Sequence, residues 1–352
     1  MRNSKYAIMK RICIFFLLLG IISCSDLQRN KFDVITQQAK CLRSEMYLSD
    51  EKTLNVYYDL AVLDTCIMFT DYFSDSLLQV RSITDPSYCI RVLYKGNGPD
   101  EFVSPYFDKS IFGQEKKEQS FIDVNSRKIA KIKFNRGLLS VKEENIMPEF
   151  PLCSSLNKTN KCIYGVDVEL DNKGMFFIWD NTNNCLLKRV DYFPEIRDGH
   201  KESSLPFLYL CDICVNEKER TVATAMLNMN LIHFYDLEGN LRKTCMIGDK
   251  LLYPDSDSKY LDFPDADKFF VHLCGSDEYV FGLYNGTNKK NAASDIFIFD
   301  WSGEFVERYE LDRPLHRIVA DNSGKYLFGI SENAEGGTDI LKISIPLKVD
   351  YP

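Results

Sequence analysis

Cys211 and Cys214 have the two-residue spacing of a redox pair or of half a zinc site. Structural zinc would need a second cysteine pair, or two histidines at ligand spacing, and the neighbouring sequence contains neither. If residues 208–215 form a β-strand, side chains three positions apart point to opposite faces of it. We therefore predict that both thiols are core residues rather than parts of one site.

The four histidines are widely separated, at His200, His233, His272 and His316. No H-E-x-x-H sequence places two of them on one helix face, as a helical zinc site requires. His233 and His272 lie in apolar segments and are predicted to face the interior. We expect hydrogen-bonded core histidines, although a ring-shaped fold would still allow metal ligands to gather from distant segments.

Five aspartates crowd a short segment and could supply oxygen ligands to calcium. They are Asp255, Asp257, Asp262, Asp265 and Asp267. The ordered D-x-D-x-D-G loop of a calcium site is absent, so we predict a solvated loop. The G-x-S-x-G motif of a nucleophile elbow is also absent. The sequence accordingly predicts no catalytic residue, no metal ion and no cofactor.

Ten cysteines follow Cys24, an even number that in an exported chain would suit a disulfide framework. They are scattered through apolar segments of a chain long enough to form a core without disulfides. Free cysteine behaves as a small buried hydrophobe. We predict mostly buried thiols, with room for one or two disulfides.

The first residues of the chain have the pattern of a secretory signal peptide. Four basic residues and no acidic one accompany the nearly unbroken apolar segment 12–22, which is followed by the small residue Ser23. The apolar segment is too short for a stable membrane-spanning helix, which needs about 20 residues. We therefore predict a signal peptide over residues 1–23.

The sequence Ile21-Ile22-Ser23-Cys24 resembles the bacterial lipobox. The resemblance implies that Cys24 is diacylated on its sulfur and becomes the new N-terminus, with acyl chains that bind a membrane. Ser25 follows, whereas aspartate there would resemble an inner-membrane retention signal, so the outer membrane is favoured. An ordinary cleaved signal with an incidental cysteine stays the alternative. The sequence leaves open whether the anchored protein faces the periplasm or the outside.

Acidic side chains dominate the chain after the signal peptide. The whole sequence has 43 basic and 51 acidic residues, and four of the basic ones precede residue 24, so the remainder has a net charge of about −12. Such a surface repels phosphate backbones, whose binding depends on clustered Lys and Arg. We therefore predict no nucleic-acid partner, and membrane contact through the lipid anchor only.

Short apolar segments bounded by Asn, Asp and Gly dominate the rest of the chain and predict β-strands. No segment has a long apolar pattern at helical spacing. We expect only a helical turn or two, near residues 33–41 and 262–269. The sequence therefore predicts an all-β protein.

Five segments share one shape: an apolar or aromatic strand, an Asp near its end, a short turn and a second strand. Their aspartates are Asp71, Asp123, Asp180, Asp236 and Asp300, at intervals of 52 to 64 residues. Asp, Asn and Gly suit the turn of a hairpin, and regular spacing indicates one supersecondary unit per interval. With a sixth unit at residues 318–345, the sequence predicts a six-bladed β-propeller of four-stranded antiparallel blades.

The propeller is predicted over residues 42–346, between a lipidated tether at 24–41 and a C-terminal tail at 347–352. A ring of blades is usually closed by one blade that takes strands from both ends of the chain, which removes exposed sheet edges. We expect residues 44–48 to complete the blade formed by residues 316–346.

One short motif, G-x-G-P-x-E-F, is formed by Gly96, Gly98, Pro99, Glu101 and Phe102. It resembles a segment between early blades of the TolB-like six-bladed propellers, a group of bacterial lipoproteins with NHL-like relatives. The resemblance implies the fold and export, and no activity. From the residues themselves we predict a structural role, with a sharp turn in which Glu101 accepts backbone N–H bonds. Contact of Glu101 with a ligand is the alternative.

The function that this sequence favours is that of a binding or scaffold module at the cell envelope, not of an enzyme. Loops or the channel mouth of a rigid propeller would engage an envelope protein or a glycan. The alternative is a metal-dependent hydrolase or lyase of the propeller lactonase type. That alternative requires three or more carboxylate, Asn or His side chains converging on the central axis. A structural subunit of an envelope assembly is a third reading.

Overall fold

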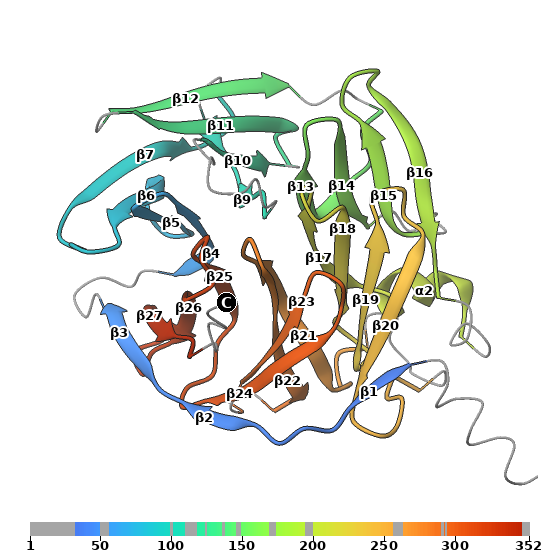
Figure 1. The fold of residues 1–352 in the computed structure, drawn as a ribbon. Helices are drawn as coiled ribbons and strands as arrows, with labels where there is room; N and C mark the ends of the chain where they lie inside the picture. The colour runs from blue at the N-terminus through green and yellow to red at the C-terminus, as the bar shows by residue number, and fades with distance from the viewer. Residues whose placement is uncertain are drawn as a thin grey trace, which may run out of the picture.

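Six β-sheets stand side by side around a central axis and form a six-bladed β-propeller (Figure 1). The structure is a computed structural model, and it describes residues 32–49, 56–98, 101–109, 118–123, 125–135, 138–145, 149–168, 174–193, 200–255, 263–289, 292 and 294–346. The predicted signal peptide, with Cys24, and the tail at 347–352 lie outside these residues. The predicted all-β, six-bladed fold is confirmed.

Each blade is a meander of antiparallel strands that starts near the axis and ends at the rim. Blade 1 contains β4 (Tyr57–Leu63), β5 (Cys66–Asp71), β6 (Ser76–Ser82), β7 (Cys89–Lys95) and the short β8 (Glu101–Phe102). Blade 2 contains β9 (Tyr106–Phe107), β10 (Glu118–Asp123), β11 (Lys128–Asn135) and β12 (Leu138–Asn145). Blade 3 contains β13 (Cys153–Lys158), β14 (Cys162–Asp167), β15 (Gly174–Asp180) and β16 (Cys185–Asp191).

The second half of the ring follows the same plan. Blade 4 contains β17 (Cys211–Asn216), β18 (Thr221–Met226), β19 (Leu231–Asp236) and β20 (Leu241–Ile247). Blade 5 contains β21 (Lys268–Gly275), β22 (Tyr279–Thr287), β23 (Asp295–Asp300) and β24 (Phe305–Leu311). Blade 6 contains β25 (Arg317–Ala320), β26 (Tyr326–Glu332) and β27 (Thr338–Ser344). A 3-10 turn (Glu202–Ser204) and the single-turn α2 (Leu205–Leu208) precede blade 4.

The ring closes as the sequence predicted, through a strand from the other end of the chain. Strand β3 (Ser44–Leu48) pairs antiparallel with β27, with Ser44 opposite Ile343 and Leu48 opposite Ile340. The outermost strand of blade 6 therefore comes from the N-terminal segment (Figure 1). Closure of this kind removes the exposed edge that β27 would otherwise present.

The segment before β3 differs from the prediction. Residues 33–41, expected to contain a helical turn, instead form β1 (Asp33–Ile35) and β2 (Lys40–Leu42), which pair in parallel with β20 and β24. Part of the predicted tether at 24–41 therefore lies against the rims of blades 4 and 5 (Figure 1). Ile35 is buried there, and pairing satisfies the backbone groups of two rim strands.

Two further expectations are corrected. Blades 1, 4 and 5 have five strands instead of four, because β8, β1 and β2 add parallel strands at their edges. The second expected helical segment, 262–269, forms a turn at residues 264–266 and then enters β21, and Asp262 lies outside the described residues.

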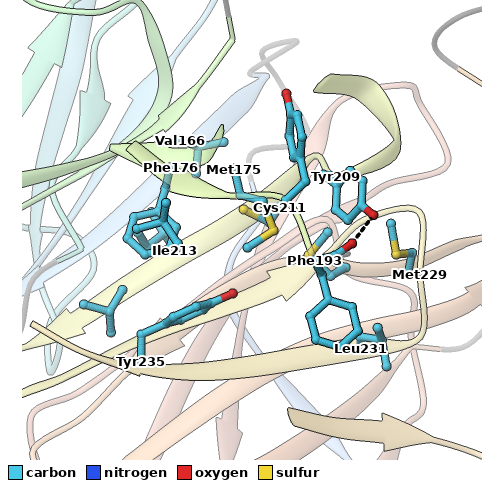
Figure 2. Close-up of a cluster of buried hydrophobic side chains, with 14 of the residues drawn as sticks. Val166, Met175, Phe176, Phe193, Tyr209, Cys211, Ile213, Met229, Leu231 and Tyr235 are labelled. Carbon is cyan, nitrogen blue, oxygen red and sulfur yellow. Dashed lines mark hydrogen bonds between the residues drawn. The ribbon is translucent and has the colours of Figure 1, made fainter. Parts of the chain in front are cut away.

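Six clusters of buried apolar side chains fill the spaces between neighbouring blades of the described chain. Figure 2 shows the cluster between blades 3 and 4, where Phe176 and Tyr235 pack edge to face with ring centroids 5.2 Å apart. The Tyr209 hydroxyl in this cluster donates to the carbonyl oxygen of Phe193. Since both faces of a blade are covered, a middle strand such as β18 is buried at every position instead of at alternate ones.

The five predicted hairpins exist, but they are not equivalent. Asp180, Asp236 and Asp300 end the third strand of their blades, whereas Asp71 and Asp123 end the second strand. In each turn the carboxylate accepts backbone N–H bonds, as from Thr182 to Asp180 at 2.7 Å. Successive strands run in opposite directions, so these two groups of turns lie at opposite ends of the ring. The spacing of the aspartates therefore identified the blades, but it grouped turns that follow second strands with turns that follow third strands.

All ten cysteines of the described residues are free thiols, and six of them are buried. Cys211 and Cys214 belong to two different apolar clusters, on opposite sides of β17. The prediction that they are separate core residues is therefore confirmed. Burial raises the pKa of the Cys153 thiol to about 12, which keeps it protonated and unreactive at neutral pH.

Candidate functional site

A cavity of about 310 Å³ opens at one end of the central axis, and we call it the vestibule. Every blade contributes to its wall from its innermost strand or the residues beside it. One residue from each, in chain order, is Asp59, Tyr106, Ser155, Asp212, His272 and Arg317. Most of these residues lie near the start of their strands, so the six inner strands begin at this end of the ring.

A partly buried ion pair forms the floor of the vestibule. The Lys109 ammonium donates to both carboxylate oxygens of Asp212, at 2.7 and 2.6 Å. The same carboxylate accepts the Ser155 hydroxyl at 3.0 Å and the Leu273 backbone N–H at 2.8 Å. Lys109 is the largest favourable influence on the Asp212 carboxyl and, with the hydrogen bonds, holds its pKa well below the usual range against the opposing effect of burial.

His272 lies beside this pair with a donor that lacks a partner. The Ile318 backbone N–H donates to His272 Nδ1 at 3.4 Å, so in the neutral ring the proton is on Nε2. That Nε2 is buried without a hydrogen-bond partner in the described residues, and it lies 3.7 Å from Asp212 Oδ2. Burial, assisted by the charge of Lys109, lowers the pKa of His272 well below its usual value, so the ring is neutral at pH 7.

Asp59 and Arg317 complete the charged lining. Asp59 Oδ2 accepts the Phe107 backbone N–H at 2.7 Å, and burial raises the pKa of this carboxyl. Arg317 is half-buried, and its guanidinium donates to the carbonyl oxygen of the preceding residue, His316, at 3.1 Å. Among the described residues no carboxylate lies within ion-pair distance of Arg317. The vestibule therefore contains one neutralised cation and one available cation.

Aromatic side chains lead from the vestibule along blade 1, and we call them the aromatic strip. Tyr106 in the vestibule wall contacts Tyr58 edge to face at 5.7 Å, and Tyr58 contacts Tyr72 at 6.4 Å. Phe73 follows, 5.3 Å from Tyr72. Tyr72 is 50% exposed and Phe73 62% exposed, so the strip is an open apolar surface beside a polar cavity.

The metal site that a lactonase-type enzyme would need is only partly represented. Asp59, Asp212 and His272 do converge on the axis, but the Lys109 ammonium already binds both oxygens of Asp212. Within the described ranges, no group of three or more His, Cys, Asp or Glu side chains is arranged to hold a metal ion. The axial groups are thus arranged around a lysine cation.

The other predicted histidines lie away from the axis. His233 is fully buried on β19 between blades 3 and 4, where it hydrogen-bonds Thr244 at 2.9 Å. His200 contacts the carbonyl oxygen of Pro254 at 3.1 Å. His233 is therefore the hydrogen-bonded core histidine that the sequence predicted, and it lies between blades because its strand is the third of its blade. His272 also faces the interior as predicted, but at the channel.

The acidic segment borders a second and larger cavity, of about 640 Å³, beside blades 4 and 5. Asp255, Asp265 and Asp267 line it, while Asp257 and Asp262 lie outside the described residues. The carboxylate of Asp267 accepts the Asn288 backbone N–H at 2.9 Å. The structure thus uses one of these aspartates to fix the neighbouring loop.

The G-x-G-P-x-E-F motif lies in the connection from blade 1 to blade 2, outside the vestibule lining. Glu101 Oε2 accepts the Gly98 backbone N–H at 2.7 Å. Phe102 is fully buried and packs edge to face on Phe121 at 5.0 Å. Pro99 lies outside the described residues. This geometry is that of a folded turn in which Glu101 accepts a backbone N–H, and the structural role of the motif stays a prediction.

Replacing Gly96 with alanine should destabilise the protein by about 1–3 kcal/mol, because the Glu101 carboxylate would have to move and give up its hydrogen bond from the Gly98 N–H. A Cβ at Gly96 would lie 2.1 Å from Glu101 Oε2. In a Glu101→Ala background the same glycine change should cost less, because the clashing carboxylate is gone. Urea denaturation of the two single variants and the double variant measures this coupling, and additive effects would contradict the proposed contact.

Sequence reasoning missed most of the vestibule. Asp59, Lys109, Asp212 and Arg317 were not singled out, although each is a charged residue at or beside an apolar inner strand. Asp212 lies between Cys211 and Cys214, the pair with the spacing of a redox or metal site. One signal in the sequence could have identified these residues. Charged residues recur near the start of the first, mostly apolar strand of several blades.

The profile of one protein family matches most of the chain. It is described as "TolB-like 6-blade propeller-like" and matches residues 30–323. A comparison with curated protein sequences finds no match. None of the helices in the described part of the chain is long and apolar enough to cross a membrane.

Two solved structures are similar to this chain. A crystal structure of a DUF4221 family member from Bacteroides vulgatus has a TM-score of 0.56 and 11% identity, covering 87% of this chain and 96% of that one. The structure of U3-55K gives a TM-score of 0.45 and 9% identity, covering 86% of this chain and 98% of that one. At 11% identity the likeness to the first structure concerns the fold alone.

Proposed function

Since the chain belongs to the TolB-like six-bladed propeller family, we propose that it is an exported, lipid-anchored binding module of the cell envelope that captures its ligand in the vestibule. The ligand would be an envelope protein segment or a glycan. The observation that carries this proposal is the convergence of all six blades on one cavity with a fixed, ion-paired floor. Ligand sites of proteins are typically concave, largely preformed and fitted with a few fixed polar groups.

The rigidity of the site supports binding as its role. Asp212 is held by donors from β13, β21 and the segment after β9, so three blades fix one carboxylate. Loops and strand ends around such a scaffold can present ligand contacts without disturbing the blades. The vestibule walls also combine apolar surface from Leu210, Leu227 and Phe270 with hydroxyl and charged groups.

The lipid anchor is supported by the lipobox-like sequence that ends at Cys24. We expect the full chain, expressed in a bacterium that processes lipoproteins, to be found in the membrane fraction and to incorporate labelled palmitate. A Cys24→Ser variant should lose the label, because a hydroxyl cannot replace the thiol in the acylation. Equal labelling of the variant would refute the anchor, and fractionation with the inner or outer membrane tests the proposed address.

Blocking the vestibule should abolish ligand binding without unfolding the protein. Ser154 is an exposed residue of the vestibule wall, and a Ser154→Trp side chain would fill much of the cavity. A defined panel of oligosaccharides and peptides, tested by thermal shift, should contain a ligand that raises the Tm of the wild type by several degrees. Saturation at about 100 times Kd stabilises a protein by about 2.7 kcal/mol.

The matched control is Thr182→Trp. Thr182 is exposed in the turn after β15, which follows the third strand of blade 3 and so lies at the other end of the ring. This variant should respond to the ligand as the wild type does, whereas Ser154→Trp should not respond. A ligand that shifts the Tm of all three proteins equally binds elsewhere, and the proposal would then be wrong.

A further inference from the structure

Arg317 is an available cation in a protein whose overall charge is strongly negative. Within the described residues its guanidinium hydrogen-bonds one group, the carbonyl oxygen of His316, while the neighbouring cation Lys109 is paired with Asp212. A guanidinium carries five N–H donors in a planar fork that matches the two oxygens of a carboxylate. Arg317 lines the vestibule and uses one donor on His316, so the guanidinium keeps donors for a ligand.

A second donor lies beside it. Arg317 precedes Ile318, whose N–H bonds to His272 Nδ1, so the backbone of β25 places the guanidinium-bearing residue next to the histidine. The protonated Nε2 of His272 is buried, with 3% of the residue exposed, and has no hydrogen-bond partner in the described part of the chain. A buried N–H without a partner costs free energy, which an incoming acceptor atom would recover.

The negative groups nearby do not cancel these donors. Asp212 is engaged by the Lys109 ammonium, one hydroxyl and backbone N–H groups, so its charge is already balanced. Asp59 accepts the Phe107 backbone N–H, and in the described part of the chain its carboxylate makes no hydrogen bond or ion pair with Arg317. The remaining preference of the vestibule is for a group with negative charge and two acceptor oxygens.

The surroundings of the donors favour a saccharide as the bearer of that group. Tyr106 is 38% exposed in the vestibule wall and starts the aromatic strip that continues through Tyr72 to the exposed Phe73. Aromatic rings pack against the C–H faces of sugar rings, while tyrosine adds a polar hydroxyl. Ser154 and Ser155 add hydroxyl groups in the same cavity.

We infer that the vestibule binds the carboxylate of an acidic saccharide, with Arg317 as the bidentate anchor, His272 Nε2–H as a second donor and the aromatic strip as the track for the following sugar rings. This inference rests on the proposed function and names the ligand class of the same site. A charge-assisted pair between Arg317 and a carboxylate is the strongest directional contact that the lining offers.

The test is calorimetric titration of the whole mature protein with a short oligouronide. A neutral glucose oligomer of equal length, acetate and a glutamate-rich peptide are titrated in parallel. We expect the oligouronide to bind at least about ten times more tightly than each of these.

Arg317→Gln should weaken oligouronide binding about tenfold or more, and Arg317→Lys should weaken it less, since lysine keeps the charge but lacks the planar pair of donors. Arg313→Gln, at an exposed arginine of the loop before β25, is the matched control and should bind as the wild type does.

A second measurement follows His272 directly. The nitrogen NMR signal of its Nε2 should shift on oligouronide binding, with the ring still neutral. Equal affinity for acetate or for the peptide would overturn the saccharide assignment. Unchanged affinity in Arg317→Gln would overturn the anchor. If a neutral glycan binds and Ser154→Trp blocks it while Arg317→Gln does not, the proposed function stands and this inference falls. If Ser154→Trp weakens the binding of none of the tested compounds, the proposed function itself is wrong.

Discussion

Replacing Asp212 with alanine should destabilise the propeller by roughly 2–4 kcal/mol, somewhat below the effect of breaking a fully buried ion pair, because the Lys109 and Asp212 side chains are each 14% exposed. The change would leave the Lys109 ammonium buried without its carboxylate, and it would remove the acceptor of Ser155 and of the Leu273 N–H. Donors from blades 2, 3 and 5 meet at this carboxylate of blade 4, so the substitution removes contacts among four blades. Urea denaturation followed by tyrosine and tryptophan fluorescence measures the change in the free energy of unfolding.

The control for Asp212→Ala is the double variant Lys109→Met and Asp212→Leu. Replacing both members of a buried pair by apolar groups of similar volume is often nearly neutral, so the double variant should recover at least half of the loss. If Asp212→Ala lowers the free energy of unfolding by less than about 1 kcal/mol, the pair contributes no more than a surface ion pair does. The ion pair would then not stabilise the vestibule.

The same carboxylate should govern part of the acid response. Its pKa in the folded protein lies below the unfolded value of about 3.9, so its contribution to stability is complete above that pH and is lost as the pH falls through the folded pKa. The wild type should therefore lose stability below about pH 4 more steeply than an Asp212→Asn variant, which has no proton to take up there. Parallel curves for the two proteins would contradict this assignment.

Deleting residues 32–49 should abolish cooperative folding or lower the free energy of unfolding by at least about 5 kcal/mol. The deletion removes β3, which closes blade 6, and β1 and β2, which cover the rims of blades 4 and 5. It also removes the buried side chains of Phe32 and Ile35, each worth about 1.5–3 kcal/mol on burial. The uncovered edges of β20, β24 and β27 would pair with other molecules, so we expect concentration-dependent aggregation.

A chain that starts at Phe32 is the matched control for this deletion. It lacks the signal peptide and the predicted lipid site but keeps all three N-terminal strands. It should give a soluble, cooperatively unfolding monomer by calorimetry and light scattering. If the chain without residues 32–49 melts as sharply and at the same temperature, the N-terminal strands do not close the ring.

The blades were predictable because their causes are local. Short aromatic segments such as 296–299 end at an aspartate whose carboxylate caps the following turn, and this pattern depends on neighbours a few residues away. The count of six followed from the spacing of such units. The same reasoning could not distinguish a turn after the second strand of a blade from a turn after the third strand. Asp71 and Asp180 accept backbone N–H bonds in their turns in the same way.

The vestibule was not predictable because its members are brought together by the ring. Lys109 and Asp212 are separated by 103 residues, and nothing in their local sequence marks them as partners. His272 reads like His233, since both follow apolar residues in a strand. One belongs to a first strand at the axis and the other to a third strand between blades, and that difference exists only once the blades are counted and oriented.

The sequence by itself determined the units of this protein: strands, capped turns, their sixfold repetition and the partner segments that close the ring. These follow from backbone preferences and from apolar periodicity, which act over short stretches of chain. Only the tertiary structure decided where charge and hydrogen-bonding groups meet, because the axis is built from one strand of every blade. Electrostatic interactions depend on distance in space, and the closed ring brings together residues that are far apart in the sequence.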